Sequence, residues 1–305
     1  FRLRVSGGSY IVVDAPPQSE NNARFLAVRE ALACGGVTVP ALFGADLERG
    51  YMLLGDLGEQ LLLPLLEEGS ADAHYADAMA VLRQLAVLPD PGPTWPAYDR
   101  ALLGEELGRF PRWFVSALLG HELDAAESGL LAAADAVLID NALEQPRVLV
   151  HRDFHSRNLM PGPDGELGVI DFQDAVRGPV TYDLVSLLRD CYIRWPAERV
   201  RGWALSHRDW LLQEGLIDSA DDERFLRWFD LMGLQRHIKV LGTFARLYLR
   251  DDKDAYLDDL PLVVQYVREM LTAYAPVEPA LADLRDWFAR TLDPLIARQP
   301  WGQSP

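Results

Sequence analysis

The stretch that decides the fold is Arg147-Val-Leu-Val-His-Arg-Asp-Phe-His-Ser-Arg-Asn-Leu-Met160, which leads into Leu167-Gly-Val-Ile-Asp-Phe-Gln-Asp174. An apolar run precedes a polar loop that ends at Asn158, and a second apolar run ends at Asp171. Short apolar runs that are bounded by turn residues are typical of β-strands. The turn residues Pro163-Asp-Gly165 predict a hairpin, which brings Asn158 and Asp171 together.

The side chains of this stretch suit phosphoryl transfer. Asp153 lies in the same loop as Asn158, so one amide and two carboxylates are predicted to converge. The transition state of phosphoryl transfer needs positioning and charge neutralisation more than covalent help. Magnesium takes oxygen ligands from one or two carboxylates or amides, and Asn158 and Asp171 supply such oxygens. Asp153 is left to accept the proton of the acceptor hydroxyl.

The pattern His151-x-Asp153-x4-Asn158, followed by Ile170-Asp-Phe172, resembles the catalytic core of the aminoglycoside phosphotransferase and choline kinase superfamily, which is related to protein kinases. The resemblance implies that Asp153 is the catalytic base. It also implies that Asn158 and Asp171 bind magnesium and, through it, the nucleotide. His155 follows the base by two residues, close to the expected γ-phosphate, and is a second candidate catalytic residue.

Two other residues are expected to support this loop rather than to react. In kinase-like cores the histidine at the position of His151 packs and hydrogen-bonds to hold the loop. Asp183, in Thr181-Tyr-Asp-Leu184, resembles the buried helix aspartate that holds the backbone of the catalytic loop in this superfamily.

Four stretches resemble, more closely, the anomeric N-acetylmuramate/N-acetylglucosamine kinases of bacterial cell-wall recycling. They are Val13–Pro17, Val169–Ala175, Gly178–Tyr192 and Leu234–Gly242. With weaker matches between them, the likeness covers nearly the whole chain. It implies an α+β, bilobal protein-kinase-like fold with a small β-rich N-lobe and a large, mainly helical C-lobe. It also implies phosphorylation of the anomeric hydroxyl of both sugars, with ATP and Mg²⁺ as cofactors.

Residues 1–58 are expected to form the nucleotide-binding N-lobe, and residues 59–305 the C-lobe with the catalytic hairpin and the acceptor site. Gly7 and Gly8 separate the segments Phe1–Val5 and Ser9–Val13 and predict a β-hairpin with a glycine turn. The chain has no initiator Met and resembles an N-lobe entered partway along. The N-lobe is therefore expected to be truncated at its start, with the phosphate-covering loop at or before residue 1.

The N-lobe also lacks an expected cation. Kinase-like folds carry a Lys on the third strand, but the chain's two lysines are Lys239 and Lys253. Arg2, Arg4, an Arg upstream of residue 1, or magnesium itself is expected to hold the phosphates instead. The segment Gly55-Asp-Leu-Gly58 falls at the interlobe hinge, so Asp56 and Leu57 are candidate cofactor-binding residues. Recognition by backbone groups there does not distinguish ATP from GTP.

Hydrophobic periodicity and turn residues predict the remaining elements. Strands are expected over 37–43 and 51–54. A helix capped by Ser19 or Asn21 is expected to run to about residue 33. Further helices are expected over 72–88, 99–119, 122–143, 182–194, 199–214, 222–250, 261–275 and 280–298, and the segment 299–305 is expected to be loose.

A polar cluster interrupts the apolar pattern of the helix predicted over 222–250. It contains Gln235, Arg236, His237 and Lys239. One interpretation is a solvated helix face. The other is an acceptor pocket, in which cationic groups bind the lactyl carboxylate of N-acetylmuramate. The candidate substrate residues are Gln173, Asp174, Arg177, Gln235, Arg236 and Lys239.

Composition narrows the class of partner. The chain of 305 residues has a formal net charge of −17, which disfavours nucleic acid and anionic membranes as partners. Two cysteines without metal-ligand spacing indicate a reduced, cytoplasmic enzyme. No apolar run is long enough to span a bilayer. A small-molecule amino-sugar is the expected substrate, and no obligate protein partner is inferred.

Three alternatives stay open. His151-x-Asp153-x-His155 also matches a fragment of a metal-hydrolase site, although such a site needs further ligands and the other histidines are scattered. A kinase of the same fold that acts on an aminoglycoside, choline or another amino-sugar is the second alternative, but a pocket for a polycation should be strongly acidic. The missing Lys suggests a catalytically silent nucleotide-binding regulator, against which the three intact catalytic positions argue.

Overall fold

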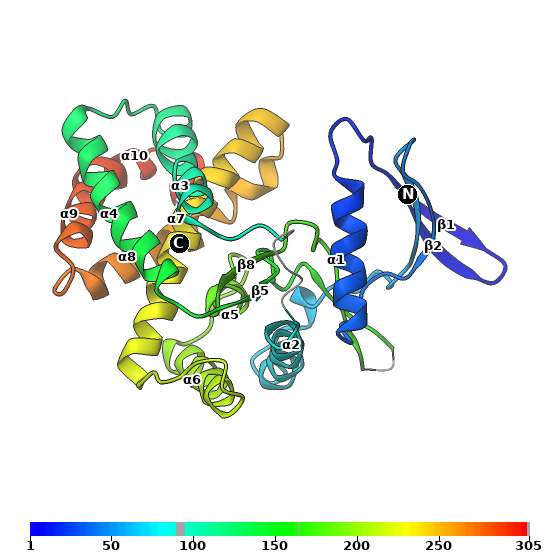
Figure 1. The fold of residues 1–305 in the computed structure, drawn as a ribbon. Helices are drawn as coiled ribbons and strands as arrows, with labels where there is room; N and C mark the ends of the chain where they lie inside the picture. Colours follow the sequence, from blue (N-terminus) through cyan, green and yellow to red (C-terminus); the bar gives the residue numbers. More distant parts are fainter. Residues whose placement is uncertain (90–94, 164, 304–305) are drawn as a thin grey trace. The chain divides into compact units, whose positions relative to one another are not determined.

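The computed structural model describes residues 1–89, 95–163 and 165–303. By its internal contacts the chain divides into two compact units (Figure 1). The first unit contains residues 1–97 and 147–187, and the second contains residues 98–146 and 188–305. The first unit thus combines the predicted N-lobe with the catalytic hairpin, and the lobe boundary at residue 58 stays a prediction.

A four-stranded antiparallel sheet of order β1-β2-β4-β3 begins the first unit. Its strands are β1 (Arg2–Val5), β2 (Gly8–Asp14), β3 (Leu42–Asp46) and β4 (Tyr51–Gly55). The hairpin predicted from the glycine pair is confirmed, with Val5 paired to Gly8. Gly8 has a φ of 152°, which a residue without a Cβ adopts readily.

The strand predicted over 37–43 is displaced, because β3 begins only at Leu42. Pro40 has no N–H with which to complete a strand ladder. The preceding residues make a different contact, in which the Thr38 carbonyl accepts the N–H of Val169 at 2.8 Å. Val37 and Val39 are buried there, so their apolar pattern reflects burial in a non-strand segment.

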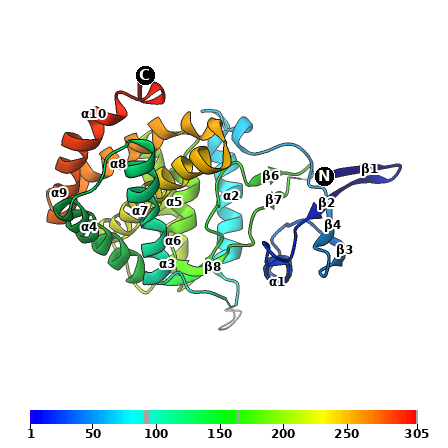
Figure 2. The same cartoon turned by 90° about the horizontal axis from the view of Figure 1, so that it is seen from above.

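Helix α1 (Asn22–Cys34) lies alongside this sheet (Figures 1 and 2). Of the two predicted caps, Ser19 and Asn21, the structure has Asn21, whose side chain accepts the N–H of Arg24 at 3.0 Å. Phe25 and Leu26 pack with Met52 and Leu54 in one apolar cluster. The cluster fixes the first turns of α1 to the sheet.

The rest of the first unit carries the catalytic hairpin. Strand β5 (Arg147–Val150) pairs with β8 (Val176–Pro179), and β6 (Leu159–Pro161) pairs with β7 (Leu167–Val169), in both cases antiparallel. Helix α2 (Ala71–Ala86) contacts β5 and β7. The other elements are η1 (Leu63–Leu65) and α5 (Tyr182–Leu188).

Every regular element in the described part of the second unit is a helix. Its elements are α3 (Arg100–Leu107), the π-helical η2 (Phe110–Leu118), α4 (Ala125–Leu143), α6 (Ala197–Gln213), α7 (Asp222–Asp251), η3 (Asp254–Leu257), α8 (Leu260–Tyr274), α9 (Pro279–Trp287), the π-helical η4 (Phe288–Leu292), α10 (Asp293–Ile296) and η5 (Pro300–Gln303).

Helix α7 is the centre of this unit. It spans 30 residues and contacts η2, α4 and α8. Gly242 faces η2 so closely that a Cβ added there would lie 2.3 Å from the backbone carbon of Arg109. Because neighbours surround its middle turns, both the apolar and the polar side chains of that region are buried.

Two predicted segments in the second half of the chain differ from the structure. The helix expected over 182–194 ends at Leu188, and the side chain of Asp190 then accepts the N–H of Tyr192 at 3.3 Å in a turn that competes with the helix. The segment expected to be loose over 299–305 forms η5 at Pro300–Gln303 instead, and residues 304–305 lie outside the described residues. The indole ring of Trp301 is 7% exposed and lies 6.1 Å from the Phe114 ring.

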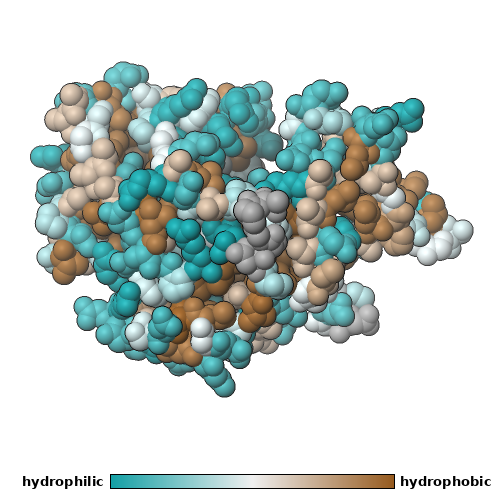
Figure 3. Space-filling view, in the orientation of Figure 1, coloured by the Kyte–Doolittle hydropathy of each residue, from teal (hydrophilic) through white to brown (hydrophobic). Residues whose placement is uncertain are grey.

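Apolar side chains also reach the surface of the first unit. Among the strands, Leu3, Val5, Phe43 and Tyr51 are exposed, and some brown surface is visible in the region of the sheet in Figure 3. Within the described residues, no helix has both the length and the apolar composition needed to cross a bilayer.

Candidate active site

His151 follows β5 and is 1% exposed. Its Nε2 atom lies 3.0 Å from the carbonyl oxygen of Ile170, and its Nδ1 atom accepts the N–H of Asp153 at 3.2 Å. Burial lowers the pKa of His151, which keeps the imidazole neutral and able to donate with one nitrogen while it accepts with the other. His151 therefore joins the catalytic loop to the end of β7, in line with its expected supporting role.

Asp183 holds the backbone of the same loop. Its carboxylate accepts the N–H of His151 at 2.6 Å and the N–H of Arg152 at 3.0 Å. Arg152 has a φ of 77°, in the left-handed region that costs energy for a residue with a side chain. The two charge-assisted hydrogen bonds offset that cost, and the contact that the resemblance implies for Asp183 is present.

The β6–β7 hairpin brings Asn158 and Asp171 together. The side-chain nitrogen of Asn158 lies 3.4 Å from a carboxylate oxygen of Asp171, and the Ile170 N–H donates to the Asn158 carbonyl at 3.1 Å. Asp164, at the centre of the predicted turn, lies outside the described residues. The convergence predicted from the sequence is confirmed, while the chemical roles of the two residues stay predictions.

Asp153 and His155 belong to the same network. The Asn158 side chain donates to the backbone carbonyl of Asp153 at 2.9 Å, and the N–H of His155 approaches that carbonyl at 3.1 Å. The Nε2 atom of His155 lies 3.5 Å from the Asn158 side-chain nitrogen. The loop therefore presents the proposed base and a proposed metal ligand as one hydrogen-bonded group.

Asp171 has a strained backbone, with a φ of 64°. Such a conformation costs about 1–3 kcal/mol and persists only where the surroundings impose it. The side chain of Gln173 donates to the Asp171 carboxylate at 3.0 Å and helps to hold it. Gln173, predicted as a substrate residue, thus contacts a proposed metal ligand.

The residues around Asp171 fit magnesium. An amide and a carboxylate stand side by side, and both offer the hard oxygen ligands that this ion prefers. Among the described residues there is no group of three or more His, Cys, Asp or Glu side chains that could hold a metal. An ion that leaves most of its positions to phosphate and water does not need such a group.

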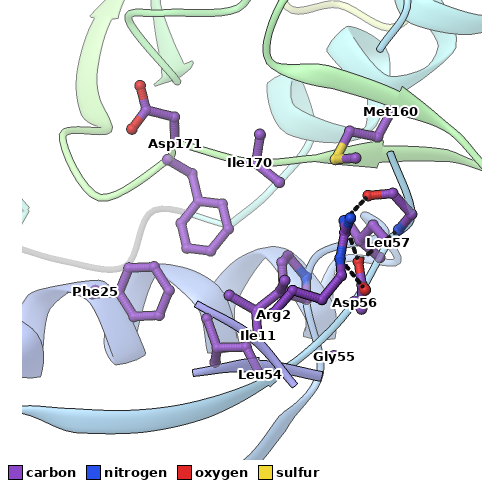
Figure 4. Close-up of a pocket in the computed structure, with 13 residues that line it drawn as sticks. Arg2, Ile11, Phe25, Leu54, Gly55, Asp56, Leu57, Met160, Ile170 and Asp171 are labelled. Carbon is purple, nitrogen blue, oxygen red and sulfur yellow. Dashed lines mark hydrogen bonds and ion pairs between the residues drawn. The ribbon is translucent and has the colours of Figure 1, made fainter. Parts of the chain in front are cut away.

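A cavity of about 290 Å³ adjoins Asp171 within the first unit (Figure 4). Figure 4 shows Asp171 and the segment Asp56–Leu57 at opposite ends of it. Its remaining lining is mostly apolar, from Ile11, Phe25, Pro40, Leu54, Met160, Ile170 and Phe172. Apolar walls with polar groups at the ends are typical of a site for a small ligand.

Asp56 is a fixed part of the predicted hinge. Its carboxylate accepts the hydroxyl of Ser9 at 2.7 Å and the N–H of Gly58 at 3.0 Å, and it pairs with Arg2 at 2.7 Å. The Ser9 hydroxyl lowers the pKa of Asp56 most strongly, against the opposing effect of burial, and Gly58 and Arg2 lower it further. Because its oxygens are engaged in this way, the Asp56 side chain braces the hinge against β1 and β2.

The arginines expected to bind the phosphates are engaged with acidic residues. Arg2 contacts Glu59 as well as Asp56, and it also donates to the Gly58 carbonyl at 2.7 Å. Arg4 pairs with Glu59 at 2.8 Å. A different arginine, which the sequence did not single out, reaches the loop behind Asp171. Arg24 of α1 donates through Nε to the Gln173 carbonyl at 2.9 Å.

The polar cluster on α7 is not a solvated face. Gln235 and His237 are fully buried, and Arg236 and Lys239 are 3% and 7% exposed. The partners of Arg236, His237 and Lys239 lie in the second unit. Lys239 pairs with Glu106 at 3.2 Å, the Arg236 guanidinium approaches the Cys191 sulfur at 3.2 Å, and Nε2 of His237 is 2.9 Å from the Arg189 carbonyl oxygen.

These contacts give Arg236, His237 and Lys239 structural partners, whereas the side-chain oxygen and nitrogen of Gln235 are buried without a hydrogen-bond partner among the described residues. An acceptor role for Gln235, Arg236 and Lys239 stays a prediction. The same holds for Asp174 and Arg177 in the first unit. The backbone carbonyl of Asp174 accepts from Arg152 at 3.3 Å, and the backbone N–H of Arg177 donates to the Pro96 carbonyl at 3.0 Å.

Known proteins with similar sequences are phosphotransferases. The model of a family described as "Phosphotransferase enzyme family" matches residues 1–229. An N-acetylmuramate/N-acetylglucosamine kinase of Pseudomonas putida is 43% identical over 292 residues, which cover 95% of this chain and 84% of that protein. A protein of the same name from Neisseria meningitidis is 41% identical over 287 residues, with coverage of 92% and 85%.

Solved structures share the fold at low sequence identity. The choline kinase LicA from Streptococcus pneumoniae matches with a TM-score of 0.60 and 15% identity, over 88% of this chain and 89% of that one. The ADP-bound aminoglycoside phosphotransferase APH(2'')-Ib matches with a TM-score of 0.55 and 17% identity, over 86% and 87%. Such likeness shows the fold alone, and it confirms the predicted α+β, kinase-like fold.

Proposed function

Since the chain belongs to the phosphotransferase enzyme family, we propose that it transfers the γ-phosphoryl group of ATP to the anomeric hydroxyl of N-acetylmuramate and N-acetylglucosamine. The names of the relatives from P. putida and N. meningitidis support this acceptor, because the similarity extends over most of the chain. The observation that carries the proposal is the 3.4 Å approach of Asn158 to Asp171, with Asn158 also bonded to Asp153.

In the proposed reaction Asp153 orients the anomeric hydroxyl and accepts its proton. The acceptor oxygen forms a bond to the γ-phosphorus while the bond to the bridging oxygen of ADP breaks. An anomeric hydroxyl is more acidic than an ordinary alcohol, so a carboxylate suffices as the base. His155 hydrogen-bonds the transferring group in this proposal.

Asn158 and Asp171 are the proposed magnesium ligands, through their amide and carboxylate oxygens. When bound, the ion supplies positive charge that offsets the charge of the phosphates. The contact of Gln173 with the Asp171 carboxylate supports this assignment, because it leaves the carboxylate oriented before any ligand arrives.

The nucleotide is proposed to occupy the cavity between Asp171 and the Asp56–Leu57 segment. The apolar walls suit a purine ring, and backbone groups of the segment are proposed to recognise its edge. Gln173, Asp174 and Arg177 are proposed acceptor residues, because they follow Asp171 closely in the chain. A cytoplasmic location is part of the proposal, and the two free thiols support it.

The proposal is tested by ADP release from magnesium-ATP with a panel of acceptors that includes both sugars, an aminoglycoside and choline. We expect release with the two sugars and loss of the reducing end in the product, since a phosphate on the anomeric carbon blocks ring opening. A product that keeps its reducing end would place the phosphate elsewhere. ADP release only with an aminoglycoside or choline would show that this compound, and not a sugar, is the acceptor. No ADP release with any acceptor would favour a nucleotide-binding regulator.

A further inference from the structure

Arg24, in the first turn of α1, holds the loop that follows Asp171. Its Nε atom donates to the Gln173 carbonyl at 2.9 Å, and its Nη2 atom donates to the Ala175 carbonyl. The first of these contacts joins residues 149 positions apart in the sequence. One planar guanidinium therefore binds two alternate carbonyls, a geometry that fits its forked donors and that a lysine cannot reproduce.

A second guanidinium binds the carbonyl between these two. Arg152, in the catalytic loop, donates through Nη1 to the Asp174 carbonyl at 3.3 Å. Three consecutive carbonyls, of residues 173–175, are thus held by two arginines from separate elements. Burial lowers the pKa of Arg24, the Asp174 carboxylate opposes this shift, and the charge of Arg152 adds to it. The Asp174 carboxylate therefore lies where it offsets the repulsion between the two cations.

The next residue of α1 contacts the other end of the loop. The rings of Phe25 and Phe172 stack with centroids 5.1 Å apart and an interplanar angle of 24°. Arg24 and Phe25, which are consecutive in α1, therefore contact the segment 172–175. This segment directly follows Asp171, which has a strained φ of 64°. Since α1 is itself packed on the sheet, the conformation of Asp171 is linked to the position of this helix.

We propose that Arg24 is a positioning residue, which sets the affinity for magnesium by holding the loop behind Asp171. The inference rests on the proposed role of Asp171 as a magnesium ligand. It gives Arg24 a task different from that of the Lys that kinase-like N-lobes carry, since its Nε and Nη2 atoms donate to backbone carbonyls rather than to phosphates. In this assignment Arg24 contacts neither the acceptor oxygen nor the γ-phosphorus.

The test compares ADP binding with and without magnesium, by calorimetry on the full chain. For Arg24→Gln we expect the affinity for magnesium-ADP to fall by about 10- to 100-fold, the usual cost of removing a partner that orients a metal ligand. The affinity for ADP in EDTA should stay at the wild-type value. Arg24→Lys keeps the charge and loses the forked donors. Its affinity for magnesium-ADP should lie between those of the wild type and Arg24→Gln.

Arg49→Gln is the matched control, since Arg49 is exposed and pairs only weakly with Asp46, at 3.6 Å. It should bind both forms of ADP as the wild type does. If Arg24→Gln weakens both forms equally, Arg24 binds phosphate or supports the fold, and the inference is overturned. Unchanged affinities would overturn it as well. Should Arg24→Gln fail to fold, the same comparison on Arg24→Lys decides.

Asp171→Asn separates this inference from the proposed function. It should abolish the gain in ADP affinity that magnesium provides. If it does not, the metal assignment fails at Asp171 itself, before Arg24 is considered. None of these measurements uses a sugar, so an error in the proposed acceptor leaves the result intact.

Discussion

Asn158 and Asp171 are 13 residues apart in the sequence, and their side chains approach to 3.4 Å at the open end of the β6–β7 hairpin. The same Asn158 nitrogen donates to the Asp153 carbonyl at 2.9 Å. The proposed base and the proposed metal ligands therefore depend on one amide group. Geometry of this kind suits a reaction in which positioning provides most of the rate enhancement.

Replacing the proposed base should separate chemistry from binding. For Asp153→Asn we expect kcat to fall by about 100- to 10,000-fold, the usual contribution of a general base. Magnesium-ADP affinity and thermal stability should remain close to those of the wild type. Asp218→Asn, at an exposed position, is the control and should be fully active. Near-normal turnover of Asp153→Asn would show that another group accepts the proton.

Removing the carboxylate that holds the catalytic loop should lower stability. Asp183→Ala leaves the N–H groups of His151 and Arg152 without the acceptor they have in the wild type. Since each hydrogen bond to a charged group contributes about 1.5–3 kcal/mol, we expect the free energy of unfolding to fall by roughly 3 kcal/mol or more. Urea denaturation measures this. Asp183→Asn keeps one acceptor oxygen and should lose less, and equal losses would contradict the hydrogen-bond explanation.

His237 should make the stability of the chain depend on pH. Burial lowers its pKa to about 3, whereas the unfolded chain has an ordinary histidine pKa of about 6.5. The unfolded state therefore binds a proton first as the pH falls, so this stabilisation is complete above pH 6.5 and declines toward pH 3. The expected loss from this group between pH 7 and pH 5 is about 2 kcal/mol.

The variant His237→Phe isolates that contribution. A phenyl ring can retain the stacking on Tyr266, whose ring centroid lies 4.6 Å from that of His237. The unfolding free energy of the wild type minus that of the variant should fall by about 2 kcal/mol as the pH falls from 7 to 5, because only the wild type loses this contribution. A difference that is constant over this range would mean that His237 titrates normally.

The buried pair of Lys239 and Glu106 should respond to single and double substitution in different ways. Their side chains are 8% and 0% exposed. Removing one charge from a buried pair leaves the other uncompensated, at a cost of about 3–5 kcal/mol, so Lys239→Met should be strongly destabilised. The double variant Lys239→Met/Glu106→Gln should recover much of that loss. Additive effects in this double-mutant cycle would show that the pair is not coupled.

The parts of the site that sequence predicts are those formed by neighbours in the chain. Asn158 and Asp171 are joined by a short hairpin whose turn residues and apolar strands are visible in the sequence. The contact of Arg24 with Gln173 has no such signal, because it depends on how α1 packs on the sheet. Hydrophobic periodicity also wrongly predicted a strand at Val37–Val39, where the two valines are buried in a segment that is not a strand.

The polar cluster on α7 shows a second limit. Gln235, Arg236 and Lys239 look like solvent-facing residues by type, yet helices pack around α7 on several sides and bury them. Which faces of a central helix are covered is decided by elements far away in the chain. Residue type alone therefore could not distinguish an exposed cluster from a buried one.

The close approach of Gly242 to Arg109 has a mechanical consequence. A methyl group at Gly242 would collide with the main chain of Arg109 and Phe110, so any larger residue there would force α7 away from η2. The absence of a side chain at residue 242 therefore sets how closely α7 and η2 pack in the second unit.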